Sequence, residues 1–133
     1  MANDVPPTSE PLACADVSLD AERLDVYRVA VEFQVLATGL LPGGRWPVLR
    51  DQLERASASI ALNIAEGCGR LSAPDKARFY GIARGSATEC AAILELLLAR
   101  GLLASPSYRR GRILLVRIIQ MLTRLSARAY ERA

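Results

Sequence analysis

The sequence predicts an all-α protein, an antiparallel up-down-up-down four-helix bundle, and three observations lead to this fold class. Apolar residues recur at steps of three and four along four separate segments. About half of the 133 residues are hydrophobic but few are aromatic, and Ala, Leu and Arg dominate, which favours helix over sheet. The connections between the segments are short, so consecutive helices should run antiparallel.

The first 19 residues differ from the rest of the chain. They contain three prolines and no sustained period, which predicts a disordered tail before a bundle domain at 20–133. No Lys or Arg precedes Arg23, whereas the chain from there onward carries all 17 basic residues against nine of the 14 acids. We expect the acidic tail to compete with phosphate for the basic residues of the bundle. Its acids are Asp4, Glu10 and Asp16.

Capping and turn residues divide the bundle domain into its helices. Asp20 is the expected N-cap of the first helix, which should end at Gly39 before the loop 40–46. The second helix should begin at Pro47 and end at Gly67. Ser72 and Ser105 should cap the third and fourth helices, which are expected at 73–100 and from Ser105-Pro106 to about Tyr130.

Each predicted helix has an apolar face that should form the core. The second helix is the central one, because its face is narrow and built mostly from small side chains, so another helix can approach it closely. For Gly85 on the third helix, close helix packing is the expected role. The core faces are Leu24, Tyr27, Val31, Val35 with Val26, Ala30, Phe33, Ala37; Leu53, Ala56, Ile60, Ile64, Gly67; Phe79, Ile82, Ser86, Cys90, Ile93, Leu97; and Leu115, Ile118, Ile119, Leu122, Leu125.

The composition argues against several classes of function. The absence of histidine removes the commonest metal ligand and the commonest general base. The three cysteines lack metal-site spacing and are an odd number, which indicates reduced thiols in a cytoplasmic protein. No signal peptide or membrane-spanning run is visible. We therefore expect no catalytic residue, no metal, no cofactor and no membrane association.

Polar residues beside the second and third apolar faces have two interpretations. Asn63 and Glu66 share one side of the second helix, and Ser86 and Glu89 share one side of the third. Glu66 and Glu89 could form a carboxylate pair for acid/base chemistry or metal binding. The favoured interpretation is a buried structural network that fixes helix register, with arginines as charge partners. Its predicted members are Asn63, Glu66, Ser86, Glu89, Arg55 and Arg84.

Arginines give the stronger functional signal. From Arg100 to the end of the chain there are eight arginines and a single acid, Glu131. Arg117, Arg124 and Arg128 are spaced to form a ridge on the predicted fourth helix. This is either an ordinary solvated helix face or a surface that binds nucleic-acid phosphates. The candidate nucleic-acid-binding residues are Arg109, Arg110, Arg112, Arg117, Arg124 and Arg128.

Motifs in the first three predicted helices resemble a known family. Residues 55–70 read Arg-Ala-x-x-Ser-Ile-x-x-Asn-Ile-Ala-Glu-Gly-x-Gly-Arg, and 79–89 read Phe-Tyr-x-Ile-Ala-Arg-Gly-Ser-x-x-Glu. Together with Leu-Asp-Val-Tyr-x-x-Ala at 24–30, they resemble the four-helix-bundle family named for proteins encoded in 23S rRNA intervening sequences. The resemblance implies a homopentamer. It also implies, through the accessory variability determinant of diversity-generating retroelements, binding to a reverse transcriptase and its template RNA.

Residues and resemblance together predict a non-catalytic oligomer. The expected function is binding of nucleic acid, foremost RNA, or of a protein such as a reverse transcriptase through the arginine surface. The alternative is a protein–protein scaffold that binds no nucleic acid. Oligomerisation is expected because apolar residues occupy more than one side of two helices. These residues are Val26, Phe33 and Val35 on the first helix and Leu94, Leu96 and Leu98 on the third.

Overall fold

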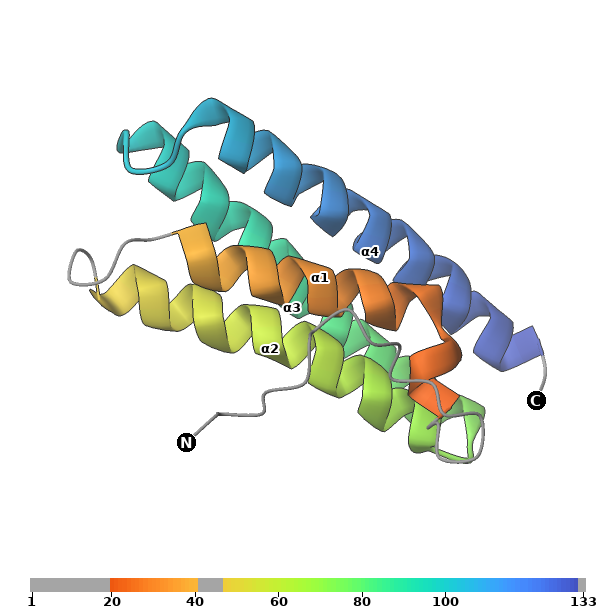
Figure 1. The fold of residues 1–133 in the computed structure, drawn as a ribbon. Coiled ribbons are helices and arrows are strands. Elements are labelled where there is room, and N and C mark those ends of the chain that lie inside the picture. Colours follow the sequence, from red (N-terminus) through yellow and green to blue (C-terminus); the bar gives the residue numbers. More distant parts are fainter. Residues whose placement is uncertain (1–19, 41–46, 132–133) are drawn as a thin grey trace, which may run out of the picture.

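The computed structural model describes residues 20–40 and 47–131, apart from the side chains of Glu22 and Arg23, and these ranges form a four-helix bundle (Figure 1). A 3₁₀ turn, η1 (Asp20–Arg23), leads into α1 (Asp25–Leu40). The longer helices α2 (Pro47–Gly69), α3 (Ala73–Ala99) and α4 (Ser105–Glu131) follow. The predicted all-α fold class is confirmed. The predictions for residues 1–19, 41–46 and 132–133 lie outside the described ranges.

The four helices form a square in which sequence neighbours run antiparallel (Figure 1). α1 packs against α2 and α4, α3 packs against the same two helices, and α1 and α3 lie diagonally opposite. η1, the end of α2, the start of α3 and the end of α4 therefore meet at one end of the bundle, which we call the η1 end. Within the described ranges, no helix is long and apolar enough to span a membrane.

Helix boundaries agree with the capping signals except at three places. Ser72 caps α3 as predicted, and its Oγ accepts a hydrogen bond from the Asp75 backbone N–H at 3.3 Å. Gly67 does not end α2, which continues to Gly69. Asp20 begins a 3₁₀ turn and not α1 itself. Ser105 lies inside α4, because the Tyr108 N–H bonds back to the Ala104 carbonyl at 3.0 Å.

Buried apolar side chains from all four helices form one core. Phe33, Ile60, Leu94 and Ile118 are among those with 1% exposure or less. The core faces of α2 and α4 largely follow the predicted periodicity. On α1 one predicted row is buried, but the other is wrong in its second half: Val31 and Val35 are exposed, because they lie on the opposite side of the helix from Phe33. The core face of α3 differs in its first half, where it is rotated by about one residue, and there the Tyr80 ring packs against Gly67 of α2. Its first-half members are Tyr80, Ala83 and Ala87, in place of Phe79, Ile82 and Ser86.

Part of the apolar surface expected to drive oligomerisation lies in this core. Val26, Phe33 and Leu94 are 4%, 0% and 0% exposed, so their burial needs no second copy. Val35 and Leu96 are exposed, at 65% and 52%. Val26, Phe33 and Leu94 were expected to lie on a second apolar side of their helices. They lie in the core instead, because a helix in a bundle buries a stripe wider than a single i, i+3, i+4 row.

Candidate nucleic-acid interface

Four arginines lie along the flank of α4 that faces α1, and we call them the arginine flank. Successive members are seven, seven and four residues apart, which keeps them on one side of a helix. All four are exposed. The last two line a hollow together with Leu24, which precedes α1, and Val26 in its first turn, so the flank faces α1. Its members are Arg110, Arg117, Arg124 and Arg128.

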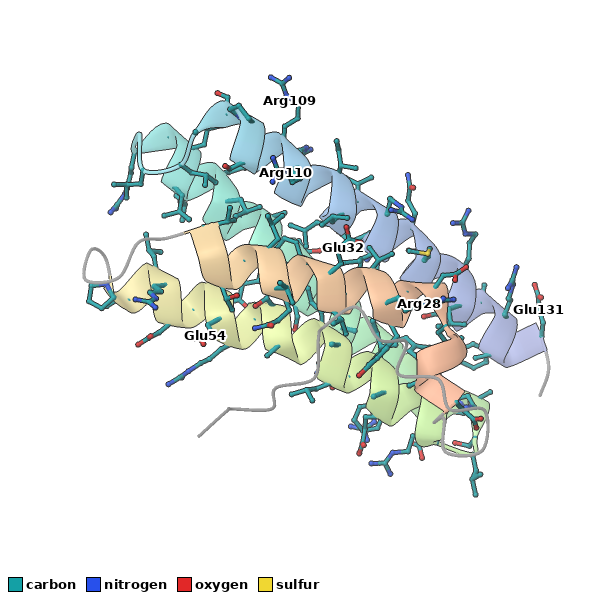
Figure 2. All side chains as sticks on the ribbon, in the orientation of Figure 1. Arg28, Glu32, Glu54, Arg109, Arg110 and Glu131 are labelled. Atoms are coloured by element: carbon teal, nitrogen blue, oxygen red, sulfur yellow. The ribbon has the colours of Figure 1, made fainter. Side chains whose placement is uncertain are left out.

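The other two predicted arginines of α4 point elsewhere. Arg112 faces α3, where its guanidinium lies 3.4 Å from a carboxylate oxygen of Glu95 and 3.4 Å from the hydroxyl of Tyr108. Arg109 projects away from the bundle (Figure 2). The structure therefore gathers four of the six predicted residues on one flank.

The arginine flank has no charge partner among the residues that the structure describes. Within residues 20–40 and 47–131, no hydrogen bond or ion pair is formed by Arg110, Arg117, Arg124 or Arg128. The nearest helix, α1, supplies few acids: Asp25 is bound to Arg28 at 2.7 Å, and Glu32 lies on the same side as Leu36, close to α4. A row of unneutralised guanidinium groups is a suitable surface for anionic oxygens.

The predicted polar network is only partly brought together. The Asn63 amide donates to the Ser59 carbonyl at 2.8 Å and to the Ser59 hydroxyl at 3.0 Å. The Ser59 hydroxyl lies 2.8 Å from that of Ser86, which links α2 to α3. Sequence reasoning missed Ser59, although its position four residues before Asn63 on the same helix side was a usable signal.

The charged members of that network lie apart from it. Glu66 is exposed and pairs at 2.7 Å with Arg70, which follows the last residue of α2. Arg84 donates to the Thr123 hydroxyl of α4 at 3.2 Å. Arg55 and Glu89 are exposed and form no hydrogen bond or ion pair within the described ranges. The network that links α2 and α3 is therefore neutral and small.

Acid/base or metal chemistry gains no support from the titratable groups. The described residues contain no cluster of three or more His, Cys, Asp or Glu side chains that could hold a metal ion. Burial raises the pKa of Cys90 to about 12, with a further contribution from Glu89. Burial also raises the pKa of Cys68, against the opposing charge of Lys76. Thiols held in the neutral form are poor nucleophiles at neutral pH.

Glycines distinguish tight contacts from open ones. A Cβ at Gly67 would lie 2.8 Å from Cε1 of Tyr80, and one at Gly111 would lie 2.7 Å from Cδ1 of Leu94. Both glycines thus permit close helix packing. Gly85 is exposed and a Cβ there would meet nothing within 4 Å, so the predicted packing role is wrong within this chain. The sequence could not tell Gly67 and Gly111 from Gly85, because a glycine in a helix does not by itself reveal whether another helix packs against it.

A groove at the η1 end was not predicted. Two adjoining hollows of about 340 and 390 Å³ share Leu24, Leu125 and Arg128. Lys76 and Tyr80 line the first, and Arg124 lines the second. The residues come from all four helices, so no local motif marks the groove. Only the antiparallel topology, which brings the start of α1 beside the end of α4, indicates it.

Comparisons with known proteins agree with this architecture. Residues 22–124 match the family model described as "23S rRNA-intervening sequence protein". A crystal structure of a protein with unknown function from the S23 ribosomal protein family of Bacteroides thetaiotaomicron is similar, with a TM-score of 0.71 and 25% sequence identity. The match covers 77% of this chain and 95% of that one. No curated protein matches the sequence.

Proposed function

We propose that this chain, which belongs to the family of 23S rRNA-intervening sequence proteins, is a non-catalytic module that binds RNA phosphates through the arginine flank of α4. The observation that carries the proposal is the row of four exposed arginines without an internal charge partner in the described ranges. Mutual repulsion among these like charges is relieved when anions lie against them. Guanidinium groups bind phosphate oxygens in bidentate geometry, which favours a phosphate backbone as that anion.

The flank suits a backbone reader better than a base reader. Tyr130 is the only aromatic residue in the last turns of α4, and none stands between Arg110 and Arg128. Base stacking needs aromatic platforms interleaved with the charges. Binding should therefore depend weakly on sequence and strongly on salt.

Assembly into an oligomer, which the resemblance implies to be a homopentamer, is part of the proposal. Each helix carries at least one large apolar side chain exposed to solvent, including Val35, Leu62, Leu96 and Ile113, at 52–68% exposure. A second copy would cover them. Repeating the arginine flank around a ring would multiply the bound phosphates and raise the affinity. Light scattering of the purified chain at micromolar concentration tests this, and a monomer would contradict it.

A protein partner such as a reverse transcriptase is a second candidate ligand. The same exposed apolar side chains favour it, since they need not all be covered by copies of this chain. In that case the chain is a scaffold and the arginines serve solubility or bind carboxylates. Mixing with a structured RNA separates the two functions, because only the phosphate-binding proposal predicts a complex with RNA alone.

The test is a salt titration of binding to a structured RNA. Replacing Arg117, Arg124 and Arg128 together by Gln should weaken binding to all RNA sequences alike. It should also flatten the dependence of log K on log salt by roughly one unit for each phosphate that is no longer bound. The melting temperature should change little, because exposed arginines contribute little to stability. No binding by the wild type at low salt would falsify the proposal.

A further inference from the structure

The groove at the η1 end has the chemistry of a peptide-docking site. Its floor is apolar, with Leu24, Leu125 and Met121 among its residues. Its cations are Lys76, Arg124 and Arg128, and its one acid, Asp25, is already paired with Arg28. The groove therefore favours an occupant that is both apolar and acidic.

Two polar groups in the groove have hydrogen-bonding capacity to spare. The Lys76 ammonium donates to the carbonyls of Cys68 and Gly67, at 2.9 and 3.4 Å, which holds it in place and leaves one of its three N–H groups. Tyr80 is 3% exposed, lines the first hollow, and forms no hydrogen bond with any described residue. Its hydroxyl can donate to a carboxylate or carbonyl oxygen of a ligand. Burial raises the pKa of this hydroxyl to about 12, so it stays protonated.

The chain itself delivers a segment to the rim of the groove. Asp20, where the described part begins, is close enough to Cys68 to influence its pKa, and Cys68 lines the first hollow. The preceding residues include the acids Asp4, Glu10 and Asp16 and no base. Apolar residues stand among them, Leu12 and Val17 included.

We propose that the acidic N-terminal segment, residues 1–19, docks in the groove at the η1 end, with apolar side chains on its floor and carboxylates against Lys76, Arg124 and Arg128. Chain length permits this, since eight extended residues from Asp20 reach up to roughly 28 Å. The groove follows α4 from Met121 to Ala129, about 12 Å of helix. Because the segment is tethered at the rim, its effective concentration is on the order of millimolar. A free peptide or small anion must overcome that advantage.

Docking also has a consequence for RNA binding, and this consequence rests on the proposed function. Arg124 and Arg128 belong both to the groove and to the arginine flank. A docked segment covers these two and leaves Arg110 and Arg117 free. The N-terminal segment thus acts as an internal competitor for RNA phosphate. Weakening the docking should tighten RNA binding several-fold and leave the chain's fold unchanged.

A nitroxide on Cys14 of the full chain tests the docking without RNA. Cys68→Ser leaves Cys14 as the reactive thiol, because Cys90 is fully buried with a raised pKa. In this background, amide signals of 121–129 should broaden strongly, whereas those at the opposite end of the bundle, 36–40, should not. A tether alone also brings the label near the η1 end, so a matched variant is required.

That variant carries Leu12→Ser, Val17→Ser and Asp16→Asn, which keep the tether length and remove the proposed contacts. The broadening at 121–129 should fall markedly in this variant, and in the parent at 0.5 M salt. Equal broadening in parent and variant would overturn the docking proposal, as would broadening spread evenly around the η1 end. RNA binding is measured separately: docking without RNA binding contradicts the proposed function alone, and RNA binding without docking contradicts this inference alone.

Discussion

The α2–α3 and α1–α4 seams of the bundle are built by different means. Across the first, the Ser59 and Ser86 hydroxyls lie 2.8 Å apart, Lys76 caps the end of α2, and Gly67 brings the helices close at Tyr80. Across the second, no side-chain hydrogen bond or ion pair joins the described residues of the two helices. Among the described residues, apolar contacts alone hold α1 against its neighbours, and arginines and hollows lie along its seam with α4. A seam with specific contacts fixes register, whereas one with unused charges is available for a ligand.

The attachment of α1 gives the largest expected effect. Phe33 is fully buried, and a Cβ on Gly111 of α4 would lie 3.6 Å from its ring. Phe33→Ala should lower the free energy of unfolding by about 3–5 kcal/mol, because it removes the largest fully buried side chain of α1. Hydrogen exchange should rise more in α1 than in α3. An equal rise in hydrogen exchange in all helices would contradict the claim that α1 is held less specifically than α3.

The close approach at Gly67 gives the next largest effect. Gly67→Ala would push a methyl group into the ring of Tyr80, at 2.8 Å, and should cost about 1–3 kcal/mol of stability. Gly85→Ala is the matched control, since the same change there meets open space and should stabilise α3 by about 0.5–1 kcal/mol. Urea denaturation of both variants measures the difference. Equal changes in stability in the two variants would contradict the claim that Gly67 is tightly packed and Gly85 is not.

The buried thiol of α3 should make stability depend on pH. Burial raises the pKa of Cys90 from its ordinary value of 9.0 to about 12, so above pH 9 the unfolded chain loses this proton while the folded chain keeps it. Stability is therefore complete below pH 9 and should fall by roughly 1 kcal/mol between pH 9 and 10. Tyr80, raised from 10.0 to about 12, should add to the fall above pH 10. In Cys90→Ala the slope between pH 9 and 10 should be smaller, and an unchanged slope would contradict the assignment.

The neutral network of the α2–α3 seam gives the smallest effect. Asn63→Ala should cost about 0.5–1.5 kcal/mol, because it removes both hydrogen bonds to Ser59. Glu66→Ala should be close to neutral, since its ion pair with Arg70 is at the surface. Thermal unfolding of the two variants makes the comparison. If Glu66→Ala destabilised the protein more than Asn63→Ala, the charged network predicted from the sequence would be supported instead.

Much of the bundle could be predicted from local sequence signals. Ser72 and Pro47 gave helix starts to within a residue, because caps act through neighbouring backbone groups. The placement of Glu66 failed because a helical period gives the side of a residue but not how deeply it is buried. The sequence also could not show that Arg112 and Arg109 lie outside the arginine flank, because this depends on where α1 and α3 pack against α4. The groove at the η1 end depends on residues from four helices, which no single segment reveals.

The functional difference between the two seams is tested most directly by two charge-matched triple variants. One replaces Arg117, Arg124 and Arg128 by Gln on the α1–α4 side. The other replaces Arg50, Arg55 and Arg78 on α2 and α3, which removes the same net charge away from the flank. Binding to a structured RNA is titrated with salt for both and for the wild type. The first variant should bind weakly with a flattened salt slope, and the second should stay close to the wild type. Equal weakening in both would show that only net charge matters and would contradict an RNA-binding flank on α4.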